Sequence, residues 1–204
     1  MQNQPTIPVF DIGNVLIHWD PRHLYRKLFD DHVEMERFLA TVCTDAWNLE
    51  QDRGRTFGEA VTLLTKEFPH YADQIRAFDE RWTETAPYAI DDSVAMLKTL
   101  RAACPRIFAI TNFNQDKFKI AREIYPFLDL FDDVVVSGDE RLLKPDPKIY
   151  QVLFSRQGLR PEDCAFVDDS EKNVVGARAV GMHAIHFQSP EQARAEFRAL
   201  GFPV

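Results

Sequence analysis

Short apolar runs that end in polar or acidic residues recur along the chain. Five of them are rich in β-branched or aromatic side chains, at residues 7–11, 106–111, 133–138, 164–169 and 182–187. Runs of this length and composition are typical of strands that are buried on both faces of a parallel sheet. Helical patterns separate or follow the later runs, at residues 91–103, 116–128, 146–158 and 173–181. The alternation predicts an α/β fold with an open, doubly wound, Rossmann-like parallel sheet.

The segment between the first predicted strand and residue 86 breaks this alternation. It carries only helical signals, at residues 23–29, 33–43, 57–68 and 71–84. About seventy residues are too many for an ordinary connection between a strand and a helix. We therefore expect a core formed by residues 1–15 and 87–204, and a small all-helical cap formed by residues 16–86. The cap should sit over the carboxyl ends of the strands, where open α/β sheets bind ligands.

Composition and charge narrow the classes of partner. The 204 residues carry a formal net charge of -8, which argues against nucleic acid and anionic membrane as main partners. The three cysteines are an odd number without a CxxC pair, so we expect free thiols and a reducing, cytoplasmic location. We find no signal peptide and no apolar stretch of the roughly 18 residues that span a bilayer. We expect a soluble monomer or homodimer that acts on a small molecule.

Polar side chains follow four of the predicted strands or their loops. Asp11 ends the first strand, Thr111-Asn112 ends the second, Lys144 follows the third, and Asp168-Asp169 ends the fourth. Each group alone is explained as well by a turn or a helix cap. The carboxyl ends of parallel strands meet at one edge of a sheet, however, so together these residues predict one pocket with acids, a hydroxyl and an ammonium group.

Four motifs around these residues resemble those of the haloacid dehalogenase superfamily, in the same order along the chain. They are FDIGNVL, ITN, LKPDPKIY and FVDDSEKNVVGARAVGM. The resemblance covers nearly the whole chain, and the four motifs together are far more specific than any one of them. It implies a helical cap of the C1 type. Within the superfamily the chain looks most like bacterial sugar-phosphate phosphatases with a D-x-G-N-V loop, such as those that act on α-glucose 1-phosphate.

The resemblance implies a nucleophile and a phosphoryl site. Asp11 would attack a small phosphate monoester and form an aspartyl-phosphate that water later hydrolyses. Thr111 and Lys144 would hold the transferred phosphoryl group. Asn14 and Asn112, together with Gly13, are the further residues that we expect at the substrate.

The same resemblance implies a Mg²⁺ cofactor. A carboxylate nucleophile is repelled by a phosphate dianion, and a divalent cation between them removes this repulsion. The expected ligands are Asp11, Asp168, Asp169 and the backbone carbonyl of Gly13. Which of the two adjacent aspartates binds the cation directly stays open at this point.

One position departs from the phosphatase pattern. Phosphatases of the superfamily usually carry a second aspartate two residues after the nucleophile, as the general acid and base. Here the residue is Gly13. We hypothesise that the substrate has a good leaving group, such as a sugar 1-phosphate, or that water or Asp20 replaces the acid; Asp20 is also a candidate helix cap.

The missing acid keeps two alternatives open. A dehalogenase acting through an aspartyl ester needs neither a general acid nor a metal, but Asp168 and Asp169 would repel the carboxylate of a 2-haloacid. A catalytically weakened phosphate-binding or regulatory module is the other alternative, and the retained nucleophile and lysine argue against it.

The predicted cap holds residues whose role the pattern leaves undecided. Glu50, Arg53 and Gly54 resemble a cap segment of the same phosphatases, so they are candidates for contact with the leaving group, although solvated residues are as common there. Four aromatic residues are expected to pack within the cap rather than to form a substrate platform: Trp47, Phe57, Trp82 and Tyr88.

Overall fold

A five-stranded parallel sheet forms the centre of the computed structural model, which describes residues 4–204. The strand order is β5-β4-β1-β6-β7. The strands are β1 (Ile7–Phe10), β4 (Phe108–Thr111), β5 (Asp133–Val136), β6 (Cys164–Asp168) and β7 (His183–His186). Each lies within one of the five apolar runs, so the predicted Rossmann-like α/β sheet is confirmed.

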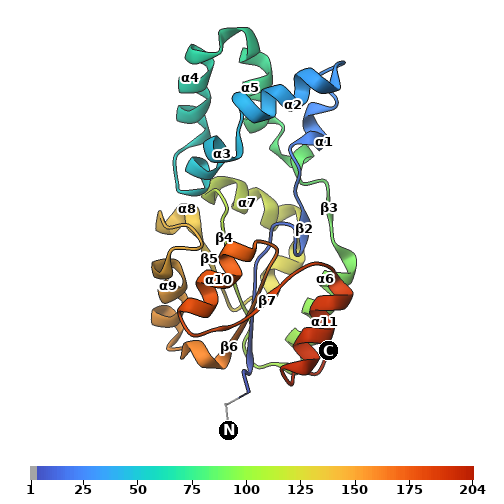
Figure 1. The fold of residues 1–204 in the computed structure, drawn as a ribbon, viewed down its shortest axis with the longest axis vertical. Helices are drawn as coiled ribbons and strands as arrows, with labels where there is room; N and C mark the ends of the chain where they lie inside the picture. The colour runs from blue at the N-terminus through green and yellow to red at the C-terminus, as the bar shows by residue number, and fades with distance from the viewer. Residues whose placement is uncertain (1–3) are drawn as a thin grey trace.

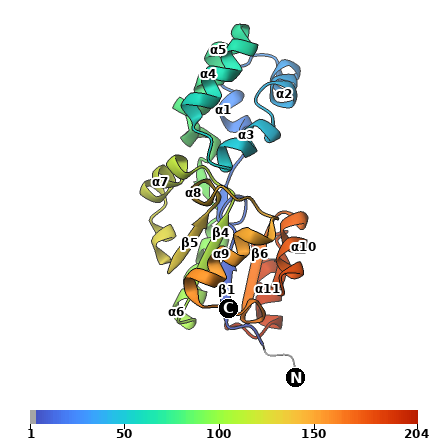
Figure 2. The same cartoon turned by 90° about the vertical axis from the view of Figure 1, so that its left-hand side faces the viewer.

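Helices cover both faces of this sheet (Figures 1 and 2). Val9 and Phe10 are adjacent in β1 and point to opposite faces, and each belongs to a different hydrophobic cluster. Phe10 shares its cluster with residues of α6 (Asp91–Ala103), α7 (Gln115–Ile124) and α11 (Pro190–Ala199). Val9 shares the other with residues of α9 (Pro147–Gln157) and α10 (Glu171–Ala179).

Three short helical segments complete this part of the chain: α8 (Ser137–Glu140), η3 (Pro126–Leu130) and η4 (Pro161–Asp163). The start of α9 agrees with the sequence, because the side chain of Asp146 accepts a hydrogen bond from Lys148 N and Pro147 is the first helical residue. All three cysteines are free and buried, as expected. Among residues 4–204, none of the helices combines the length and apolarity required to cross a bilayer.

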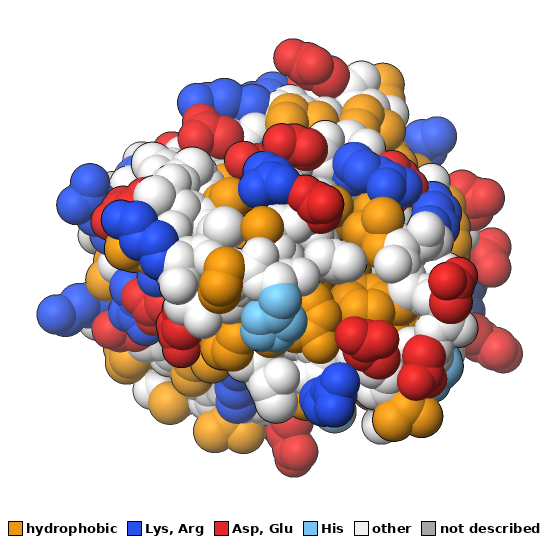
Figure 3. Space-filling view, turned by 90° about the horizontal axis from the view of Figure 1, so that it is seen from above, with side chains coloured by type: hydrophobic (Ala, Val, Ile, Leu, Met, Phe, Trp, Pro, Cys, Tyr) orange, Lys and Arg blue, Asp and Glu red, His pale blue; other side chains and the backbone are white. Residues whose placement is uncertain are grey.

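A second group of helices lies between β2 (Ile17–His18) and β3 (Tyr88–Ala89) in the chain. We call residues 19–87 the helical lobe. It contains α1 (Arg22–Tyr25), α2 (His32–Thr41), α3 (Asp45–Asp52), α4 (Phe57–Glu67), η1 (Pro69–Tyr71), α5 (Ala72–Glu80) and η2 (Trp82–Thr85). Figure 1 shows the lobe above the sheet, and Figure 3, seen from above, shows positive and negative side chains intermixed on this face.

Two elements of this segment, β2 and α3, were not predicted from the sequence. Ile17 and His18 form β2, which pairs antiparallel with Tyr88 and Ala89 of β3. A strand of two residues is too short to show an alternating pattern, so periodicity does not reveal it. Helix α3 was not expected either, because its eight residues are mostly polar and the one that it buries is Gln51.

Candidate active site

Asp11 lies directly after β1, between the ends of β4 and β6. The register pairs Phe10 with Ala109 on one side and with Val167 on the other. Asp11 N donates a hydrogen bond to Val167 O at 2.8 Å, and Ile12 N donates to Asp11 Oδ1 at 2.7 Å. The carboxylate is therefore held in one orientation at the carboxyl edge of the sheet, where it is only 6% exposed.

Lys144 joins two of the carboxylates at this edge. Its Nζ lies 2.8 Å from Asp11 Oδ1 and 2.6 Å from Asp168 Oδ2, and its side chain is fully buried. Burial opposes the charge of the ammonium group, but the two carboxylates outweigh this effect and raise the pKa of Lys144 above its ordinary value. The lysine is thus a fixed positive charge beside the nucleophile.

The adjacent acids at the end of β6 have different surroundings. Asp168 is fully buried, and its oxygens accept hydrogen bonds from Ser170 N and from Asn173 Nδ2 besides pairing with Lys144. Asp169 is partly exposed and faces the cavity. Asp168 therefore positions Lys144, while Asp169 has the more accessible carboxylate.

The acidic cluster fits a divalent cation. Carboxylate oxygens of Asp11, Asp168 and Asp169 lie within 4.8 Å of one another. Burial and the charges of Asp168 and Asp169 raise the pKa of Asp11 above its ordinary value, against the opposing charge of Lys144. Three carboxylates face one ammonium group, and a hard cation with oxygen ligands is the group that offsets the remaining negative charge.

Thr111 and Asn112 end β4 at the same edge, with different roles. The hydroxyl of Thr111 is buried and has no hydrogen-bond partner among the described residues, so it is available to a ligand. Asn112 contacts the backbone of Lys144 at both ends of its side-chain amide. It donates to Lys144 O at 3.1 Å and accepts from Lys144 N at 2.8 Å. It lines the cavity, but its hydrogen bonds fix the lysine loop.

Gly13 and Asn14 form a turn after the nucleophile, and both line the cavity. Asn14 has a left-handed backbone (φ 53°), and its side chain accepts a hydrogen bond from Trp19 N at 2.9 Å. A Cβ built at Gly13 would meet no other atom within 4 Å. The position therefore has room for the side chain that the phosphatase pattern usually places there.

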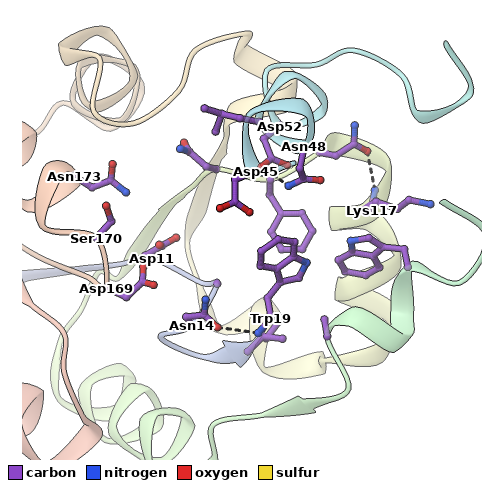
Figure 4. Close-up of a pocket in the computed structure, with 18 of the residues that line it drawn as sticks. Asp11, Asn14, Trp19, Asp45, Asn48, Asp52, Lys117, Asp169, Ser170 and Asn173 are labelled. Carbon is purple, nitrogen blue, oxygen red and sulfur yellow. Dashed lines mark hydrogen bonds between the residues drawn. The ribbon is translucent and has the colours of Figure 1, made fainter. Parts of the chain in front are cut away.

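A cavity of about 390 Å³ opens above Asp11 (Figure 4). Aromatic side chains line part of it: Trp19, Phe57, Trp82 and Phe113. Phe57 and Trp82 were expected to pack within the lobe, and they do so while also contacting the cavity. Lys117 lines it too, with its Nζ 2.5 Å from Asp79 Oδ1 in the lobe.

One polar helix face at the cavity was missed by the sequence reasoning. Asp45, Asn48, Leu49 and Asp52 of α3 line it together. Their spacing of three, four and seven residues is the signal that places side chains on one face of a helix. Glu50 and Arg53, which the sequence proposed, are half-exposed, pair with each other and do not line this cavity.

A family model described as haloacid dehalogenase-like hydrolase matches residues 8–181. The chain belongs to this family. The matched residues of this haloacid dehalogenase-like hydrolase run from β1 to the end of α10, so they include Asp11, Lys144 and Asp169.

Individual relatives of this hydrolase differ in activity. It is 25% identical to the sesquiterpene phosphatase astK of Aspergillus oryzae over 195 aligned residues. The alignment covers 94% of this chain and 94% of that one. It is 27% identical to (S)-2-haloacid dehalogenase 1 of a Pseudomonas species over 97 aligned residues. This alignment covers 48% of this chain and 43% of that one.

A solved haloacid dehalogenase family enzyme of Bacteroides thetaiotaomicron has the same fold. Its TM-score is 0.77 at 23% identity, over 96% of this chain and 100% of that one. A second structure of that enzyme, with a TM-score of 0.71 at 22% identity over 90% of this chain and 94% of that one, is a complex with magnesium and inorganic phosphate.

Proposed function

We propose that this hydrolase is a Mg²⁺-dependent phosphatase that cleaves small phosphate monoesters through an aspartyl-phosphate at Asp11. The observation that carries the proposal is the cluster of Asp11, Asp168 and Asp169, in which buried Lys144 pairs with Asp11 and Asp168 and the accessible Asp169 faces the cavity. Such a cluster has a net negative charge that suits a divalent cation. The sesquiterpene phosphatase to which the chain is similar, and the magnesium and phosphate in the Bacteroides enzyme, support the same activity.

Each residue of the site has a task in this reaction. Asp11 attacks phosphorus, with its carboxylate already oriented by Ile12 N. Lys144 stabilises charge on a phosphoryl oxygen, and the unpaired hydroxyl of Thr111 donates to another. Bound Mg²⁺, held by Asp11 and Asp169 with the Gly13 carbonyl, would supply charge neutralisation between nucleophile and phosphate. Asp168 contributes chiefly by holding the ammonium group of Lys144 in place.

We also propose that the helical lobe is a C1-type cap over this site. The cap would comprise residues 16–86, which are the helical lobe and the strand β2 before it except for residue 87, and residues 1–15 and 87–204 would form the core. The cavity lies between α3 and the sheet edge. Carboxylate and amide groups of α3 match hydroxyl groups of a ligand, and the aromatic walls match its apolar face. Sugar phosphates combine both properties, and we propose them as the substrate group to test first.

A 2-haloacid dehalogenase is the alternative, favoured by the Pseudomonas relative and by the absence of an acid at Gly13. The acidic cluster argues against it. A 2-haloacid is itself an anion, and without a divalent cation Lys144 alone would face the charges of Asp11, Asp168 and Asp169.

A substrate screen with and without Mg²⁺ tests the proposal. The panel contains sugar 1-phosphates, sugar 6-phosphates, a prenyl phosphate and 2-haloacids, and the proteins are wild type, Asp11→Asn and Asp30→Asn. Asp30 is an exposed aspartate of the lobe and serves as the matched control. Phosphate release that needs Mg²⁺ and Asp11, but not Asp30, supports the phosphatase. Halide release that survives chelation would replace it with the dehalogenase, and phosphate binding without turnover would indicate a regulatory module.

A further inference from the structure

The proposed phosphatase needs a proton for the oxygen that leaves with the alcohol. Gly13 cannot give one. Asp20, the substitute suggested by the sequence, is engaged elsewhere: its Oδ1 accepts hydrogen bonds from Arg22 N at 2.9 Å and from the Arg22 guanidinium at 3.3 Å. It also lies outside the lining of the main cavity. Asp20 lines only an adjoining pocket, together with Asn14 and Asp169. A carboxyl group on another element that lines the main cavity is better placed to donate the proton.

The face of α3 that lines the cavity offers two carboxyl groups. Figure 4 shows Asp45, Asn48 and Asp52 projecting from α3 into the cavity, apart from Asp11 and Asp169 on the sheet side. Asp45 is exposed, at the start of the helix, whereas Asp52 is only partly exposed, at its end. An in-line attack by Asp11 directs the leaving oxygen away from the sheet, and thus toward the lobe. The position of α3 suits a proton donor.

Asp52 is held in place by the core. Its carbonyl accepts a hydrogen bond from Ser137 Oγ at 2.6 Å, and Asn114 Nδ2 donates to the carbonyl of neighbouring Gln51 at 3.1 Å. Gly54, two residues on, packs so closely that a Cβ there would lie 2.7 Å from Gly138 O. The end of α3 is therefore fixed against the core, which holds the backbone of Asp52 at the cavity that Asp11 also lines.

The surroundings of Asp52 favour its neutral form. Asn48 Nδ2 donates to its Oδ2 at 3.3 Å, and no Lys or Arg of residues 4–204 forms an ion pair with it. The charged groups that line the same cavity are Asp45, Lys117, Lys172, Asp11 and Asp169, and Lys117 is paired with Asp79. Burial raises the pKa of Asp52 to about 7, with the backbone N–H of Asn114 opposing the shift.

We propose that Asp52 is the general acid and base of this site, in place of the acid that Gly13 lacks; this inference rests on the proposed phosphatase function. In the first step Asp11 forms a bond to phosphorus, the bond from phosphorus to the leaving oxygen breaks, and the Asp52 proton moves to that oxygen. In the second step water attacks phosphorus, its proton moves to the Asp52 carboxylate, and the bond to Asp11 breaks. The products are the alcohol and inorganic phosphate.

Two substrates whose leaving groups differ in their need for a proton test the role of Asp52. p-Nitrophenolate leaves without protonation, whereas an alkoxide needs a proton. Asp52→Asn should therefore lower kcat/KM for an alkyl phosphate by roughly 100-fold or more, and for p-nitrophenyl phosphate by less than about 5-fold. The decline of alkyl phosphate turnover above about pH 7 should disappear in the variant. Asp45→Asn, on the same helix face, should change kcat/KM for both substrates by a similar factor.

A rescue variant separates chemistry from folding. Gly13 has free space around a Cβ, so Gly13→Asp can introduce a carboxyl beside the nucleophile. When Gly13→Asp is added to Asp52→Asn, kcat/KM for the alkyl phosphate should rise at least about 10-fold above that of Asp52→Asn alone. Equal losses on both substrates in Asp52→Asn, or an unchanged alkyl phosphate rate, would overturn the proposal. Turnover of p-nitrophenyl phosphate that survives Asp11→Asn would instead overturn the proposed role of Asp11, and the lack of any phosphate ester turnover by the wild type would overturn the phosphatase function itself.

Discussion

Replacing Asp52 with asparagine removes a carboxyl group that the folded protein places in a cavity without a cationic partner. The substitution keeps the size of the side chain and one oxygen that can accept the hydrogen bond from Asn48 Nδ2. Its main effect on stability is therefore the removal of an ionisable group. The expected consequence is a change in how the free energy of unfolding depends on pH.

The size of this pH dependence follows from the pKa of Asp52 in the folded protein. Burial raises the pKa of Asp52 from 3.8 to about 7 in the folded protein, so the folded state binds an additional proton between these values. A raised carboxyl pKa leaves stability unaffected below the unfolded pKa and lowers it as pH rises toward the folded pKa. About 3 pKa units at about 1.4 kcal/mol each give about 4 kcal/mol at most, of which about 2 kcal/mol falls between pH 5.5 and pH 8.

Urea denaturation of the wild type, Asp52→Asn and Asp45→Asn at several pH values between 5.5 and 8 measures this effect. As pH rises over this range, the free energy of unfolding of the wild type should fall by up to about 2 kcal/mol more than that of Asp52→Asn. Asp45→Asn, an exposed position on the same helix, should follow the wild-type profile. Parallel profiles for wild type and Asp52→Asn would show that the Asp52 carboxyl is well hydrated, which would refute the reasoning from its burial.

Three further substitutions test other parts of the site. Lys144→Met leaves buried carboxylates unpaired and should lower the free energy of unfolding by about 3–5 kcal/mol in urea titrations; a loss below about 1 kcal/mol would contradict a buried ion cluster. Asn112→Ala removes two hydrogen bonds to the Lys144 backbone and should cost about 1–3 kcal/mol and lower kcat more than it raises KM; an effect on KM alone would indicate direct substrate binding. Lys117→Met breaks a partly exposed pair with Asp79 and should cost no more than about 1 kcal/mol by the same titrations.

The sheet and its edge follow from local sequence patterns. Each strand is a short buried run, and a parallel sheet brings the carboxyl ends of the runs to one edge. Asp11, Thr111 and Asp168 therefore come together whatever the details of packing. The motif order identified the family, which the match over residues 8–181 confirms. The five predicted strands required no knowledge of distant contacts.

The lobe face of the cavity could not be predicted in the same way. Asp52 and Asn48 are polar residues of a short helix, and polar helix residues usually face solvent. Their contact with the cavity depends on tertiary bonds between the lobe and the core, such as Ser137 Oγ to Asp52 O. Asn112 illustrates the same limit, because its role as a clamp depends on Lys144, thirty-two residues away in the chain.

The most direct test of the phosphatase account is a rapid acid quench of a single turnover in the presence of Mg²⁺. Mass spectrometry of the peptide that contains Asp11 should show the mass of one phosphoryl group on Asp11, and Asp11→Asn should show neither this modification nor product. Phosphate release by the wild type without a phosphorylated Asp11 at any time point, together with turnover that survives Asp11→Asn, would contradict the account.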